Sequence, residues 1–213
     1  PYRPDDRRPW NLARAAHLFR RAAFGADWST LRRALADGPE AAIGRLLRPE
    51  RDTAAFNQQL DEYESASAGA GSAEGLRSWW LRRMITTPHP LLEKMTLFWH
   101  GHLATSNAKV QDARLMQQHV ALLRKHALGR FDALLAAVSR DPAMLVWLGS
   151  DANRKAQPTE HLARALFEQF ALGPGNFTEE DVREAARALT GWFVLRGRLR
   201  YFEREHDAGT KKV

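Results

Sequence analysis

The segment Asp112–Ala127 reads DARLMQQHVALLRKHA and carries a clear helical pattern. Its apolar residues and both histidines recur at three- and four-residue spacing, so they fall on one side of a helix. A helix with such an apolar side buries it against other helices, which predicts a helical core. The residues on that side are Leu115, Met116, His119, Leu122, Leu123 and His126.

The same periodicity continues in both directions along the chain. An apolar stripe covers Leu12–Ala23 and ends at Gly25, a residue that commonly terminates helices. Thr178–Asp181 is typical of a capping box at the start of another helix. Only Phe193–Phe202 departs from this pattern, because it alternates around a glycine as a hairpin does. The sequence therefore predicts an all-α, multi-helix orthogonal bundle with a short C-terminal β-hairpin.

The domain organisation is predicted from a change in composition after Pro49. The sequence becomes polar there and then reaches Ser65–Ser72, a run of small residues that is typical of a linker. We expect an N-terminal helical segment over 1–64 and a flexible linker over 65–73. A main helical domain with the terminal hairpin follows over 74–213, packed as one unit with 1–64.

Composition excludes several classes of function. The 213 residues contain no cysteine, which excludes disulfides, iron–sulfur clusters and thiol catalysis. The net charge of +7 weakly favours acidic partners. The basic residues are scattered and aromatics do not interleave with them, so nucleic-acid binding is not predicted. No stretch approaches the roughly 20 apolar residues of a membrane span, and no signal segment begins the chain.

Chemistry-bearing residues are densest in residues 88–102, which hold three of the eight histidines. His100 and His102 are two residues apart, and a regular helix places such residues on nearly opposite faces. If Gly101 ends the helix, His102 can swing round, and imidazoles and carboxylates become available to a metal ion. In the alternative interpretation, Phe98 and Trp99 belong to the core and the histidines bond backbone carbonyls.

Three further residue sets have two interpretations each. His119 and His126 share an apolar helix face, which indicates half-buried structural histidines, with a proximal haem ligand as the lesser alternative. Asp141 precedes a proline and is expected to be an N-cap. A third set, at four-residue steps, forms either a surface ion-pair ladder or a buried carboxylate–arginine network facing the central histidines. It consists of Glu160, Arg164 and Glu168.

These sets supply the candidate site residues. Metal candidates are His89, His100, His102 and Glu160, and catalytic candidates are His100, His102, Glu93, Arg164 and Glu168. The cofactor that such a site would take is a metal ion or haem.

The chain resembles the bacterial domain-of-unknown-function 1800 family in four blocks. These include HLFRRAAFG at His17–Gly25, EKM and FWHGH within Leu91–Ser106, SRDPAM within Arg124–Leu148, and ALTGW within Glu160–Trp192. The resemblance implies an exported or envelope-associated bacterial protein, often encoded beside a sulfatase-like partner. It also implies a longer protein, so an end at Val213 predicts a fragment or truncated copy.

The fourth block departs from the family pattern in this chain. Ala165 replaces a glutamate of that pattern, and Thr159 and His161 replace two amides. If the helix presents a polar site in the family, this copy has lost part of it. The function predicted first is therefore a non-catalytic or vestigial interaction module that packs against a partner protein or a missing C-terminal part. The alternative is a metal- or haem-dependent enzyme centred on the His89–His102 cluster.

Overall fold

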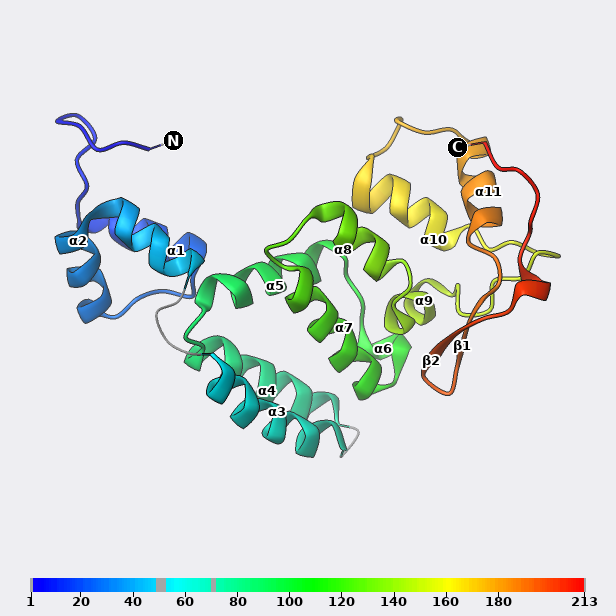
Figure 1. The fold of residues 1–213 in the computed structure, drawn as a ribbon, viewed down its shortest axis with the longest axis horizontal. Helices are drawn as coiled ribbons and strands as arrows, with labels where there is room; N and C mark the ends of the chain where they lie inside the picture. Colours follow the sequence, from blue (N-terminus) through cyan, green and yellow to red (C-terminus); the bar gives the residue numbers. More distant parts are fainter. Residues whose placement is uncertain (1, 49–52, 70–71, 213) are drawn as a thin grey trace. The chain divides into compact units, whose positions relative to one another are not determined.

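The computed structural model describes residues 2–48, 53–69 and 72–212. The chain divides into two compact units, Pro1–Leu97 and Phe98–Val213, and each is described by itself. In the described residues, eleven α-helices and one two-stranded hairpin confirm the predicted helical class with its C-terminal hairpin (Figure 1). No helix among these residues is long and apolar enough to cross a membrane.

The first unit begins with two helices that pack through small and aromatic side chains. The side chain of Asn11 caps the first helix, and Ala15, Phe19 and Ala34 are buried between the two. The second helix bends at Gly38, whose φ of 84° is left-handed. The helices of this unit are α1 (Leu12–Ala22), α2 (Trp28–Leu47), α3 (Ala54–Gly69), α4 (Ala73–Thr86) and the first turns of α5 (Pro90–His102).

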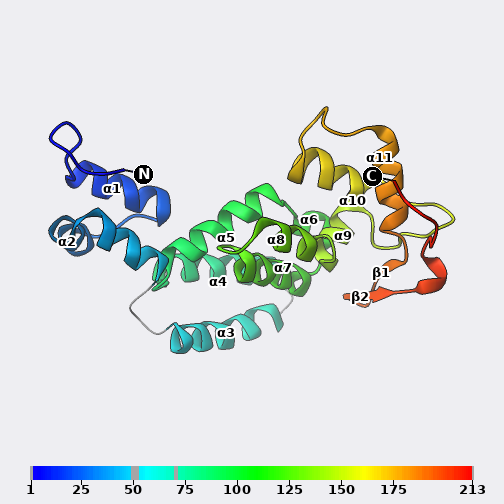
Figure 2. The same cartoon turned by 45° about the horizontal axis from the view of Figure 1, so that its top comes forward.

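Helix α3 bears on the expected linker. It continues to Gly69, so residues 65–69 are helical, whereas 70–71 lie outside the described residues. Ser72 then caps α4 by accepting a hydrogen bond from the Gly75 amide. Helices α3 and α4 run side by side (Figures 1 and 2), and the Trp79 indole of α4 donates to the Leu60 carbonyl of α3 at 3.2 Å. The division into 1–64 and 74–213 stays a prediction.

The second unit is built around α7, the helix that the opening segment predicts. Its core buries Leu103, Leu123, Leu134 and Met144. The elements after α5 are α6 (Asn107–Val110), α7 (Ala113–His126), α8 (Phe131–Val138), α9 (Pro142–Leu148), α10 (His161–Arg164), a π-helical stretch (Ala165–Ala171), α11 (Glu179–Ala188), β1 (Trp192–Leu195), β2 (Arg198–Tyr201) and a 3₁₀ turn (Glu203–Glu205).

The hairpin closes through two residues in the left-handed region. Arg196 has a φ of 52° and Gly197 a φ of 70°, a pair typical of the tight type I′ turn. Trp192 pairs with Tyr201 at the open end, and their rings lie 4.9 Å apart. The sequence pattern thus predicted both the hairpin and the glycine at its turn.

Candidate functional site

The end of α5 decides whether His100 and His102 form one site. The helix runs through Gly101 to His102, so the condition under which His102 could swing round, a helix end at Gly101, is not met. The Nε2 atom of His102 lies 3.0 Å from the Phe170 carbonyl oxygen, whereas the His100 ring faces His119 at a centroid distance of 5.9 Å. The two histidines therefore face different neighbours, as their spacing on an unbroken helix requires.

A buried pair joins α7 to the start of α9. The Nδ1 atom of His119 lies 2.8 Å from a carboxylate oxygen of Asp141, and the side chains are 0% and 2% exposed. The same carboxylate accepts a hydrogen bond from the Met144 amide at 2.9 Å, which confirms Asp141 as the N-cap of α9. His119 was expected to be half-buried, but it is fully buried, and Asp141 satisfies its Nδ1.

His100 lies beside this pair and is half-buried. Burial, and next the charge of His119, lower the pKa of His100 to about 4, so its imidazole is neutral at pH 7. The Nε2 atom of His119 is buried and has no hydrogen-bond partner among the described residues. Chemically, the arrangement offers two imidazoles and one carboxylate that holds a ring in place. No group of three His, Asp or Glu residues able to hold a metal occurs in the described parts of the chain.

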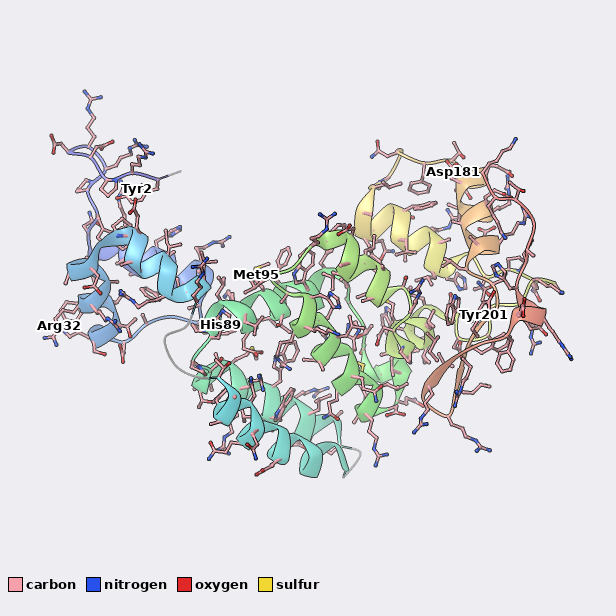
Figure 3. All side chains as sticks on the ribbon, in the orientation of Figure 1. Tyr2, Arg32, His89, Met95, Asp181 and Tyr201 are labelled. Atoms are coloured by element: carbon pink, nitrogen blue, oxygen red, sulfur yellow. The ribbon has the colours of Figure 1, made fainter. Side chains whose placement is uncertain are left out.

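Two other candidates belong to the first unit. His89 lies just before α5 (Figure 3), and desolvation lowers its pKa. Glu93 is 1% exposed by side chain and accepts a 2.7 Å hydrogen bond from the Nε atom of Arg83 on α4. The Arg83 guanidinium also lies over the Phe56 ring at 5.5 Å. Glu93 is therefore engaged in a buried ion pair that ties α5 to α4.

The carboxylates of the fourth block lie in an exposed network. Arg164 donates to Glu160 at 3.0 Å and to Glu179 of α11 at 2.7 and 2.8 Å, and Glu179, then Glu160, raise its pKa. Glu160 is 40% exposed by side chain and Glu179 63%. Within the described residues, no hydrogen bond or ion pair joins Glu160 or Glu168 to a histidine. The ladder interpretation of this helix face thus fits the contacts, whereas the buried-network interpretation does not.

The helix that carries these residues is irregular. Four α-helical residues of α10 pass into the π-helical stretch, whereas the four-residue steps of Glu160, Arg164 and Glu168 predicted one regular helix face. Short π-helical segments often occur at functional sites. Ala165, the position of the missing glutamate, is the first residue of the stretch and is 3% exposed. A polar cavity of about 760 Å³ lies at the start of α10. Its polar lining includes Arg154, Gln157, Thr159, Glu160, His161 and Arg164.

Comparison with known proteins identifies the family to which the chain belongs. The family model described as "Protein of unknown function (DUF1800)" matches residues 17–213. The chain belongs to the DUF1800 family. No curated protein and no solved structure matches this DUF1800 chain. The family therefore agrees with the expected resemblance, and the function has to be argued from the side chains.

The first DUF1800 block, His17–Gly25, lies on and just after α1 and borders a second cavity. This cavity has a volume of about 710 Å³ and lies among α1, α2 and the N-terminal segment. We call it the α1 groove. Its apolar wall contains Tyr2, Trp10, Leu18, Pro39 and Ile43, and its rim contains Arg14, His17, Arg20 and Arg21.

The α1 groove was not predicted from the sequence, because only the apolar stripe of Leu12–Ala23 carried an expectation for this helix. The sequence nevertheless indicates a basic surface on this helix, because α1 has basic residues in its last turn and contains no acidic residue.

Proposed function

We propose that this DUF1800 chain is a non-catalytic interaction module whose α1 groove binds an acidic segment of a partner protein. The observation that carries the proposal is an apolar cavity rimmed by arginines without acidic partners. In the described residues, Arg20 and Arg21 form no ion pair with a carboxylate. Ion pairs inside a monomer normally compensate neighbouring cations, so an uncompensated rim favours an anionic partner.

The walls of the groove provide the apolar part of the binding surface. Ile43 is 42% exposed, and Tyr2 lies over α1 (Figure 3) at 38% exposure. The Arg14 guanidinium stacks on the Tyr2 ring at 5.1 Å, and the Trp10 indole donates to the Ala34 carbonyl at 2.9 Å. These contacts hold the aromatic wall in place, and pre-organised aromatic and arginine side chains are the usual anchors of protein interfaces.

The charge distribution supports the same partner. Residues 2–48 hold ten arginines and five acidic residues, which amounts to +5 of the chain's net +7. Such a concentration raises the association rate of an acidic partner and makes it dependent on salt. We therefore expect a segment with Asp or Glu beside Leu or Phe, whose acids meet the rim and whose apolar side chains enter the groove.

The experiment uses a fluorescent peptide that alternates Glu with Leu and Phe, and measures its binding by anisotropy at several salt concentrations. We expect Arg20→Glu/Arg21→Glu to weaken binding by about tenfold or more. The matched control is Arg198→Glu/Arg200→Glu, which changes net charge equally on the exposed hairpin strand β2. Ile43→Asp tests the apolar wall separately.

Equal losses in the groove and hairpin variants would show a net-charge effect and reject the groove. A single-stranded oligonucleotide that binds more tightly than the peptide, and loses binding in Arg20→Glu/Arg21→Glu, would reject the protein partner. The rival function is a metal- or haem-dependent enzyme, and the buried Nε2 atom of His119 beside His100 favours it. Stoichiometric metal or a Soret band in the purified chain would support that rival.

A further inference from the structure

We infer that the polar cavity at the start of α10 is a second binding site, independent of the α1 groove, for a small hydroxylated oxyanion such as a sugar acid. Gly149 is the left-handed residue that ends α9, with a φ of 66°. A side chain at Gly149 would begin 3.7 Å from the Nδ1 atom of His161 and 3.9 Å from the Nζ atom of Lys109. These two nitrogens can therefore be no more than 7.6 Å apart, the sum of the two distances.

Both nitrogens keep hydrogen-bonding capacity for a ligand. The Lys109 ammonium donates one hydrogen bond, to the Trp147 carbonyl at 2.5 Å, and an ammonium has three donors. In the described residues, neither Lys109 nor His161 has a carboxylate partner. Both side chains are exposed, so a ligand reaches them without a change in the fold.

The spacing suits one oxyanion. A carboxylate, phosphate or sulfate places its oxygens about 2.2–2.5 Å apart, and each oxygen accepts a hydrogen bond of about 2.8 Å. An anion between the two nitrogens can therefore contact both at once. A Cβ at Gly149 would lie in ordinary van der Waals contact with both nitrogens, so both approach the same point beside the end of α9.

The rest of the lining specifies hydroxyl groups beside the anion. Gln157 and Thr159 line the cavity as neutral donors and acceptors, and the Glu160 carboxylate is an acceptor. Two acidic residues already hold the Arg164 guanidinium, and Glu205 holds Arg154 at 3.0 Å, so neither arginine presents an uncompensated charge. A ligand that binds Lys109 and His161 through its anionic group can form hydrogen bonds with Gln157 and Glu160 through its hydroxyl groups.

The experiment follows the His161 ring by NMR while glucuronate, gluconate, inorganic phosphate or glucose is added to the full chain. We expect both sugar acids to shift the His161 signals in a saturable way and to bind about tenfold more tightly than inorganic phosphate. Glucose should produce no saturable shift. For the variants, binding is measured calorimetrically, and Lys109→Gln and His161→Gln should each weaken sugar-acid binding by about fivefold to tenfold.

The matched control is Lys155→Gln, because Lys155 is an exposed lysine that follows Arg154 of the lining and, unlike Lys109, has no atom within 4 Å of a Cβ placed at Gly149. Unchanged sugar-acid affinity in both Lys109→Gln and His161→Gln overturns the site. Equal affinities for phosphate and the sugar acids overturn the hydroxyl part, and saturable binding of glucose overturns the requirement for an anion. The melting temperature of each variant is first compared with that of the parent chain. Lys109 and His161 lie on different helices, α6 and α10, so if one substitution disturbs folding, the other still tests the site.

Discussion

His119 and Asp141 connect two helices through a single buried hydrogen bond of 2.8 Å. The carboxylate serves two purposes, because it also caps α9 through the Met144 amide. A buried imidazole without a partner is unfavourable, and so is an uncapped helix start. Asp141 therefore holds together the core of the second unit, and its substitution tests that role.

We expect Asp141→Ala to lower the free energy of unfolding by about 2–4 kcal/mol, the sum of a lost cap and an unsatisfied buried imidazole. Asp141→Asn keeps an oxygen for both hydrogen bonds and should lose about half as much. Urea denaturation followed by tryptophan fluorescence measures both. Equal losses in the two variants would show that the negative charge of Asp141, and not an acceptor oxygen at this position, provides the stability.

The buried Arg83–Glu93 pair gives a second prediction, in the first unit. Glu93→Ala should destabilise the chain by about 3–5 kcal/mol, because it removes a carboxylate that Arg83 contacts in an apolar setting. The double variant Arg83→Met/Glu93→Leu should be less destabilised, since it buries no charge at this position.

The control for this pair is the exposed Arg130–Asp132 bridge, whose side chains are 83% and 65% exposed. Asp132→Ala should leave the urea midpoint unchanged, because solvent screens such pairs. A double variant of Arg83 and Glu93 that is as unstable as Glu93→Ala would mean that packing, and not charge, determines the effect.

Local patterns predicted most of the helices and the hairpin because both depend on short-range spacing. The cap at Asp141 and the glycine turn at 197 follow from neighbouring residues. The π-helical stretch was missed because its amphipathic pattern differs little from that of an α-helix. Gly101 lies inside α5 despite its low helix propensity, so the break that would bring His102 round to His100 does not form.

The candidate site was less predictable because it depends on which faces of distant helices meet. Sequence spacing placed His119 on an apolar face, yet only the fold brings Asp141 to it, 22 residues later. The partners of Arg164 were unpredictable for the same reason, because the second carboxylate that it contacts belongs to Glu179 on α11. Neither partner shares a helix with the residue that it contacts, so periodicity within a helix carries no information about the pair.

A third prediction concerns pH. The pKa of His100 falls from 6.5 to about 4 in the folded chain, because of burial first and the charge of His119 second. Between these values the unfolded chain binds more protons at this residue than the folded chain does. The stability that depends on neutral His100 is therefore fully present above about pH 6.5 and is lost as the pH falls toward 4.

His100→Gln should reduce this slope in urea midpoints measured between pH 7 and pH 4. The control is His126→Gln, a substitution at a partly exposed position on α7. An unchanged slope in His100→Gln would place the acid sensitivity in another group of the chain.

The last prediction concerns the turn that leads into the hairpin. Gly191 has a φ of 92°, and a methyl group there would lie 2.8 Å from the Tyr201 ring and 3.1 Å from the Phe202 carbonyl oxygen (Figure 3 labels Tyr201). Gly191→Ala should therefore destabilise the chain by about 2–4 kcal/mol through backbone strain and overpacking. Gly175 has a similar φ of 83° with open space around it, so Gly175→Ala isolates the backbone strain and should cost about 1 kcal/mol. Thermal denaturation of both variants separates the two contributions, and equal melting temperatures would show that the contact with Tyr201 relaxes freely.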